Sequence, residues 1–161
     1  MEIRKARLKD VNSLVPLASR LMTHNRSLAK TENARLEQYE LVPNAMVLWN
    51  EWASKWIKSP KGLVLVAEDD GKLVGYSLIF IKKNVKIYSA KEIGHISDLY
   101  IEENFRGKGI ASKFKKMAFS WFKQKGIKFA SIAVHAKNRH AHSVYEEWGF
   151  FDFLTEMRIK L

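Results

Sequence analysis

The spacing of apolar positions along the chain changes repeatedly between the periods typical of strands and of helices. Alternating or continuous apolar runs predict strands over 2–6, 63–68, 73–82, 94–102, 128–134 and 150–161. Apolar residues three and four positions apart predict helices over 11–21, 28–58 with a break near Pro43, 110–125 and 139–148. Asp70-Gly71 is typical of a tight hairpin turn between the second and third strands. This order of elements predicts an α/β fold with a mixed sheet.

Length and composition fit one globular domain, which we expect to span residues 1–161. The chain has no cysteine, and this excludes disulfides, thiolate metal sites and a cysteine nucleophile. Its first ten residues carry charges where a signal peptide would be apolar. The longest apolar run, 73–81, is too short to cross a bilayer. We therefore expect a cytoplasmic protein that makes no membrane contact.

The charge of the chain is distributed unevenly. The formal net charge is +11, and residues 104–145 contain ten Lys and Arg but no Asp or Glu. Most of these lysines are expected to form a solvated surface, and the alternative is a polyanionic partner, either a phosphate-bearing ligand or a nucleic acid. A local phosphate-binding turn would favour the first of these.

A glycine-containing turn between a predicted strand and a predicted helix lies at the start of this basic stretch. Gly107 and Gly109 lack the Cβ atoms that would block close approach of a diphosphate, and Arg106 and Lys108 add positive charge beside them. The first turn of the following helix leaves backbone N–H groups unpaired, and its dipole favours an anion. The turn therefore predicts a phosphate site, although it matches neither the P-loop nor the full dinucleotide-binding pattern.

Two segments resemble the signatures of one enzyme superfamily, the GNAT N-acetyltransferases. The run RGKGIA over 106–111 resembles the superfamily's R/Q-x-x-G-x-G/A signature. The segment 134–150 resembles its second hallmark, in which Asn138 precedes Tyr145 by seven positions and Gly-Phe follows. The distance between the two segments also matches. The resemblance implies a mixed, mostly antiparallel sheet of six to seven strands, flanked by about four helices, with two central parallel strands splayed apart.

The same resemblance implies transfer of an acetyl group to a primary amine by direct attack in a ternary complex, with acetyl-CoA as cosubstrate and no metal. It implies acceptor-side helices at about 10–60 and an acetyl-CoA-binding core at about 94–150. Tyr145 would be the general acid for the departing thiolate. The residues it implies for cofactor binding are Leu99, Tyr100, Ile101, Arg106, Gly107, Lys108, Gly109, Ile110, Ala111, Ser112 and Asn138.

The general base is a choice between His95, Asp98 and a water molecule. A free alkylamine has a pKa near ~10, so some group must remove its proton before it attacks. His95 is the first candidate, because an imidazole titrates near neutral pH and the residue precedes the implied thioester site on the same strand. Asp98 points to the opposite face under strict alternation and reaches the face of His95 only if a β-bulge intervenes.

The acceptor amine stays open between a small molecule and a protein. Trp49, Trp52 and Trp56, with carboxylates such as Glu37 and Glu51, are candidates to line its pocket. Other acyl-CoA donors stay open as well. Two alternatives from other classes are a basic nucleic-acid-binding module and a catalytically inactive CoA-binding sensor. The resemblance also implies a possible homodimer in which the C-terminal strand, 153–161, takes part.

Overall fold

The computed structural model describes residues 1–29 and 40–160. Its strands are β1 (Glu2–Lys5), β2 (Gly62–Asp69), β3 (Lys72–Lys83), β4 (Glu92–Ile101) and β5 (Ala130–Ile132). Its helices are α1 (Val11–Ala29), α3 (Ala45–Lys58), α4 (Ile110–Gln124) and α5 (Arg139–Glu147), with short 3-10 turns at Leu8–Asp10 and Glu103–Phe105. None of the described helices is long and apolar enough to cross a membrane.

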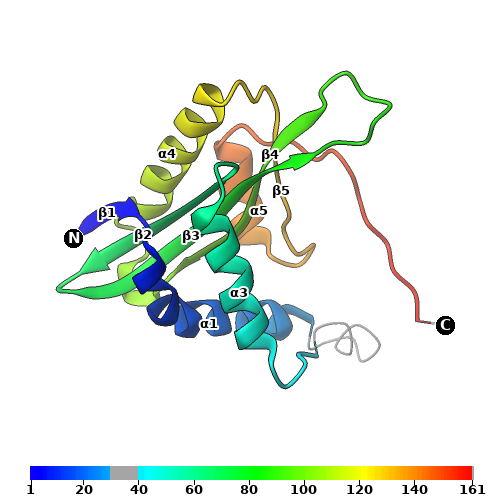
Figure 1. The fold of residues 1–161 in the computed structure, drawn as a ribbon. Coiled ribbons are helices and arrows are strands. Elements are labelled where there is room, and N and C mark those ends of the chain that lie inside the picture. Colours follow the sequence, from blue (N-terminus) through cyan, green and yellow to red (C-terminus); the bar gives the residue numbers. More distant parts are fainter. Residues whose placement is uncertain (30–39, 161) are drawn as a thin grey trace.

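The five strands form one sheet in the order β1-β2-β3-β4-β5 (Figure 1). Neighbours from β1 to β4 pair antiparallel, whereas β4 and β5 pair parallel, so the sheet is mixed and mostly antiparallel as expected. The two-residue turn Asp70-Gly71 joins β2 to β3, which confirms the predicted hairpin. The connection from β4 to β5 runs through α4, as a parallel pair requires.

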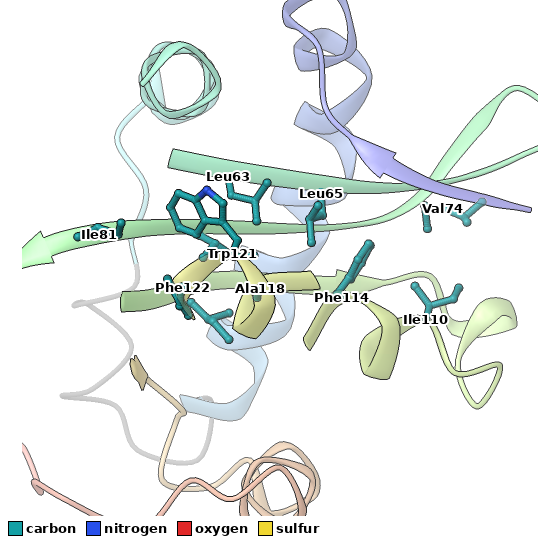
Figure 2. Packing of buried hydrophobic residues seen from close by; sticks show 12 residues of the cluster. Leu63, Leu65, Val74, Ile81, Ile110, Phe114, Ala118, Trp121 and Phe122 are labelled. Atoms are coloured by element: carbon teal, nitrogen blue, oxygen red, sulfur yellow. The ribbon is translucent and has the colours of Figure 1, made fainter. Parts of the chain in front are cut away.

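Helices cover both faces of the sheet, and the alternating side chains of β2 show how the two faces are divided. Leu63 and Leu65 belong to a core cluster on the α4 side, where Phe114 of α4 is also fully buried (Figure 2). Val64 and Val66, one residue out of phase, belong to a second cluster with α1 and α3. Burial of apolar surface on both faces supplies the main driving force for folding this sheet.

The C-terminal segment differs from its prediction as a strand. Residues 150–160 form no helix or strand, and beyond Phe150, which packs against Phe119 of α4, they extend away from the sheet (Figure 1). Alternation suits a segment to strand pairing, but a strand also needs a neighbour that supplies backbone partners, and no described strand pairs with these residues. The described chain therefore has five strands where six to seven were expected. The large apolar side chains that this segment leaves exposed are Phe151, Phe153, Leu154, Met157 and Ile159.

Candidate active site

The parallel strands β4 and β5 separate part-way along β4. Their pairing covers Gly94 to Ile96 on β4, opposite Ala130 to Ile132 on β5. β4 continues to Ile101 with β3 on one side, but no strand of the described chain pairs with its other edge beyond Ile96. This confirms the expected splay of the two parallel strands. The backbone N–H and C=O groups of 97–101 that face this edge therefore have no strand partner among the described residues, and those that no side chain binds are available to a ligand.

A β-bulge lies where the two strands separate. Leu78 of β3 pairs with Asp98, while Ile79 pairs with Ile96, so Ser97 is an extra residue in β4. Strict alternation would place Asp98 on the face opposite to His95. The bulge instead brings Asp98 to the face that carries His95, the α1 and α3 side of the sheet, as its contacts with α3 and β3 show.

The Asp98 carboxylate is held by three neutral donors from three elements. Trp49 Nε1 donates to it over 3.1 Å, the Tyr76 hydroxyl over 2.9 Å and Ser97 Oγ over 3.0 Å. The backbone carbonyl of Asp98 accepts a fourth bond, from Ser77 Oγ at 2.9 Å. We call these four bonds the Asp98 clasp. Burial raises the pKa of Asp98, and the three hydrogen bonds to the carboxylate only partly oppose that shift.

His95 is half-buried on β4, one residue before Ile96, the last residue of β4 that pairs with β5. Its Nδ1 lies 2.8 Å from Ser131 Oγ on β5, and that oxygen lies 3.3 Å from the carbonyl of Gly94. No described residue hydrogen-bonds to His95 Nε2. Burial, with the positive charge of Lys82 nearby, lowers the pKa of His95 to about 4. The imidazole is therefore neutral at physiological pH.

An aromatic wall connects α3 to His95. Trp56 stacks on Phe80 with centroids 4.3 Å apart, and Trp52 meets the same ring edge-on at 6.0 Å. Phe80 in turn meets the His95 ring at 5.2 Å. Of the carboxylates expected on this side, Glu51 is exposed and Glu37 lies outside the described residues. We use the term aromatic wall below for Trp52, Trp56 and Phe80.

The predicted phosphate turn has the conformation that an anion site needs. Gly107 and Gly109 have φ values of 73° and 76°, a region that disfavours side chains, and Gly109 caps the start of α4. A Cβ at either position would meet no atom within 4 Å, so the space above the turn is open. Arg106 Nε donates to the carbonyl of Ile101 over 3.0 Å, which joins the turn to the end of β4. The open edge of β4 and the first turn of α4 are thus joined through Arg106, and both are candidates to bind a long, phosphate-bearing ligand.

The other two expected site residues lie on or beside α5. Asn138 Oδ1 accepts from the backbone N–H of Ala141 over 3.2 Å and so caps that helix. The Tyr145 ring packs near Trp148 and Phe150, and its hydroxyl has no hydrogen bond to any residue that the structure describes. Burial raises the pKa of Tyr145 and keeps the hydroxyl protonated. No described hydrogen bond joins Asn138 or Tyr145 to β4.

Residues 18–150 match the model of the acetyltransferase (GNAT) family. The chain belongs to this family. Over 156 residues it is 24% identical to YhfO of Bacillus subtilis (strain 168), an uncharacterized N-acetyltransferase, and the match covers 93% of this chain and 89% of that protein. Its fold is similar to that of a tetramutant of the BH1408 protein of Bacillus halodurans, at a TM-score of 0.80 and 21% identity with both chains fully covered.

A second solved structure with a similar fold is a predicted acetyltransferase with acetyl-CoA from Clostridium acetobutylicum. The TM-score is 0.78 at 19% identity, with 99% of this chain and 95% of that chain covered. Membership in the GNAT family makes this chain an acetyl-CoA-dependent acetyltransferase. Among the described residues of this GNAT enzyme, no cluster of three or more His, Asp or Glu could hold a metal ion.

Sequence reasoning found the turn and the central strand of this GNAT enzyme but missed the residues that surround Asp98. Tyr76 and Ser77 read as ordinary strand positions, and Trp49 was expected only as a candidate pocket residue. One available signal was a serine in an otherwise apolar or aromatic run, since Ser77 interrupts residues 73–81 and is 2% exposed. A buried hydroxyl needs a partner, and this one bonds to the carbonyl of Asp98.

Proposed function

We propose that this GNAT enzyme acetylates a primary amine by direct attack on acetyl-CoA in a ternary complex. The observation that carries the proposal is the open edge of β4 beside the glycine turn at the start of α4. An extended chain with amide groups can pair along the edge while its diphosphate meets the helix N-terminus. We also propose that residues 1–161 form one catalytic domain.

Backbone groups of Leu99, Tyr100 and Ile101 would hold the pantetheine arm of acetyl-CoA. The carbonyl of Ile101 already accepts a bond from Arg106, so the N–H groups of this edge are its more available partners. The diphosphate would meet Arg106, Lys108 and the backbone N–H groups of Gly107, Gly109, Ile110, Ala111 and Ser112. The Asn138 side chain already accepts a bond from the N–H of Ala141 at the start of α5. It would therefore bind the pantetheine arm while it also keeps this capping bond.

We assign the general base to His95. Its Nδ1 is engaged with Ser131, while Nε2 has no described partner and the ring is neutral at physiological pH. Ser131 Oγ has one proton, and donation of that proton to the carbonyl of Gly94 makes His95 Nδ1 the donor in their contact. The lone pair is then on Nε2. Asp98 is the weaker candidate, because donors already occupy both of its carboxylate oxygens.

The proposed reaction forms one C–N bond and breaks one C–S bond. Acetyl-CoA supplies an acetyl group activated as a thioester. His95 Nε2 takes a proton from the attacking amine, and the Tyr145 hydroxyl gives a proton to the departing sulfur. A backbone N–H of the open β4 edge, at Leu99 or beside it, would stabilise the charge that develops on the carbonyl oxygen.

The aromatic wall supports an acceptor amine with an apolar or aromatic body. Its half-buried rings lie on the face of the sheet that also carries His95. Such rings bind apolar surface and leave polar contacts to a few groups.

We further propose a cytoplasmic enzyme, since acetyl-CoA is made and used inside cells.

We also propose a homodimer in which the described part of the C-terminal segment, residues 153–160, of each copy pairs with the other copy. Among the described strands, β5 is the last of the sheet and has one unpaired edge, and the apolar side chains of the C-terminal segment are strongly exposed. An unpaired edge and an unpaired strand-like segment are complementary. Analytical ultracentrifugation of the full chain, compared with a chain that ends at residue 152 and so keeps the packed Phe150, would test this.

Calorimetric titration with acetyl-CoA, with CoA and a short DNA duplex as comparisons, tests the proposed function. We expect micromolar or tighter acetyl-CoA binding, and at least tenfold weaker binding by Arg106→Glu, which reverses a charge at the turn. Lys128→Glu changes the charge by the same amount away from the turn and serves as the matched control. Salt-dependent DNA binding without acetyl-CoA binding would instead favour a nucleic-acid-binding module.

The catalytic roles are tested with a panel of primary amines, and turnover of each amine is measured by the release of the CoA thiol. Tyr145→Phe should lower turnover much more than acetyl-CoA affinity, because it removes only the proton donor. Acetyl-CoA binding without turnover of any amine would favour a CoA-binding sensor.

A further inference from the structure

The Asp98 clasp lies between two differently supported halves of β4. Before it, Glu92–Ile96 has β3 on one edge and β5 on most of the other. After it, residues 99–101 pair with β3 alone. The clasp therefore lies directly after the point where β4 loses its pairing with β5 and contains the extra residue Ser97.

We propose that Asp98 is a positioning residue whose clasp fixes the β-bulge at Ser97 and thereby aligns the backbone of residues 99–101 for acetyl-CoA. The proposal rests on the proposed function, because it takes the open edge of β4 as the acetyl-CoA site. It gives Asp98 a role through the backbone, separate from proton transfer by His95.

The physical argument starts from the cost of a bulge. An extra residue interrupts the ladder and leaves local backbone groups without strand partners. In this chain side chains replace the missing ladder bonds. Ser77 Oγ holds the carbonyl of Asp98, and Tyr76, its neighbour on β3, holds the carboxylate. Asp98 is thus fixed to β3 at both its main chain and its side chain.

Trp49 extends the clasp to the helical layer. Its indole bonds to the carboxylate, and its ring meets Tyr76 edge-on with centroids 5.6 Å apart. Trp49 and Tyr76 are 5% and 0% exposed, so the two donors cannot move freely. The bulge is therefore held from α3, from β3 and from within β4 by Ser97.

An amide at position 98 separates the positioning role from a proton-transfer role. The oxygen of an asparagine can accept from Trp49 and Tyr76 while its nitrogen donates to the Ser97 hydroxyl, so the clasp survives without a base. A leucine has a similar size but can accept none of the three bonds. It also leaves Trp49 Nε1 and the Tyr76 hydroxyl buried without partners.

The experiment compares Asp98→Asn and Asp98→Leu in the full chain. Acetyl-CoA affinity is measured by calorimetry, and kcat and KM for acetyl-CoA with an amine that the panel finds active. Asp98→Asn should stay within about threefold of the wild type in all three, whereas Asp98→Leu should lose about tenfold or more in kcat/KM and in affinity. Thermal unfolding is followed alongside.

Asp10→Ala is the matched control. Asp10 is another buried carboxylate with three hydrogen bonds, to Arg4 and to the Arg7 N–H, and it lies at the start of α1 rather than on β4. Its loss should lower the melting temperature and leave acetyl-CoA affinity unchanged. The same loss of affinity in Asp10→Ala and Asp98→Leu would reduce the clasp to general stability and overturn the proposal.

Four other results would also overturn it. Asp98→Asn as inactive as Asp98→Leu would make the carboxylate a proton acceptor, and a folded Asp98→Leu with unchanged kinetics would remove the role altogether. If Asp98→Leu does not fold, Ser77→Ala decides: it removes the bond to the Asp98 carbonyl and should weaken acetyl-CoA binding about threefold, so unchanged binding counts against the clasp. A wild-type chain that does not bind acetyl-CoA overturns the proposed function first, and this proposal with it.

Discussion

Asp10 and Asp98 each accept three hydrogen bonds through a buried or largely buried carboxylate, but the charges around them differ. Arg4 forms a two-bond pair with Asp10 at 2.7 and 3.0 Å and also bonds to Glu68. This pairing lowers the pKa of Asp10. Asp98 receives only neutral donors, and burial raises its pKa.

The difference distinguishes Asp10, a carboxylate that anchors β1 to α1 and stabilises the fold, from Asp98, a carboxylate at the candidate active site. A carboxylate paired with a guanidinium is compensated, and it ties β1 to the start of α1 through Arg4. A desolvated carboxylate without a cation costs stability, so its presence beside a broken strand ladder indicates a function that offsets the cost. Asp98 lies at the bulge that opens β4, whereas Asp10 lies on a regular part of the fold.

The largest effect that we expect on stability is that of Asp10→Ala. The change leaves the Arg4 guanidinium with Glu68 alone, so the free energy of unfolding should fall by about 2–3 kcal/mol. Urea unfolding followed by circular dichroism measures it. A loss below about 0.5 kcal/mol would mean that Glu68 compensates Arg4 by itself and that Asp10 is not the anchor.

His95 extends the comparison to a second uncompensated group. Its pKa of about 4 lies below the value of about 6.5 in an unfolded chain, so the unfolded state binds the proton first as the pH falls. The wild type should therefore lose about 1–2 kcal/mol of stability between pH 6.5 and pH 4 through this group, allowing for its partial exposure. His95→Gln should remove that loss. Urea unfolding at pH 7, 5.5 and 4.5 measures the stability of both proteins. An equal loss of stability in the wild type and in His95→Gln as the pH falls would contradict the assignment.

The isosteric amides should act in opposite directions at the two carboxylates. Asp10→Asn weakens an ion pair and should cost about 1 kcal/mol at pH 7. Asp98→Asn removes a desolvated charge and keeps the clasp, so stability should stay level or rise by up to about 1 kcal/mol. The two variants are compared in one urea series, and equal losses would show that the carboxylates are equivalent.

The smallest effect is the pH dependence of these two differences, a few tenths of a kcal/mol per pH unit. The pKa of Asp10 is lowered on folding, so its contribution is full above about pH 4 and is lost as the pH falls through the folded pKa. The pKa of Asp98 is raised on folding, so stability declines as the pH rises from about 4 through the folded pKa. With rising pH, the free energy of unfolding of the wild type should increase relative to that of Asp10→Asn and decrease relative to that of Asp98→Asn. Slopes of one sign would contradict the opposite shifts.

The parts of the site that the sequence predicted are those set by neighbouring residues. The turn at 106–109 follows a strand and precedes a helix, and the positive φ values of Gly107 and Gly109 agree with the glycines chosen there. The apolar stripe of α4 is likewise local, since Ile110 and Phe114 repeat at the helical period and both are buried. Each of these needs only a few adjacent residues.

From the sequence, the bulge in β4 could be stated only as a condition: Asp98 reaches the face of His95 if a bulge is present. No local signal at Ser97 specifies it, because a serine fits a regular strand as well. Trp49, Tyr76 and Asp98 lie 22 to 49 positions apart along the chain, so their bonds exist only after α3 has packed on the sheet.

By itself, the sequence determined the periods of the elements that the structure contains, the hairpin at Asp70-Gly71, the glycine turn before α4 and the family. Tertiary structure alone decided the face of Asp98, the loss of the second neighbour of β4 beyond Ile96, and the unpaired state of residues 150–160. The physical reason is the same in each case. Turn geometry and helical or strand period depend on neighbouring residues, whereas a register shift, a desolvated carboxylate and a strand without a partner depend on which distant segments meet.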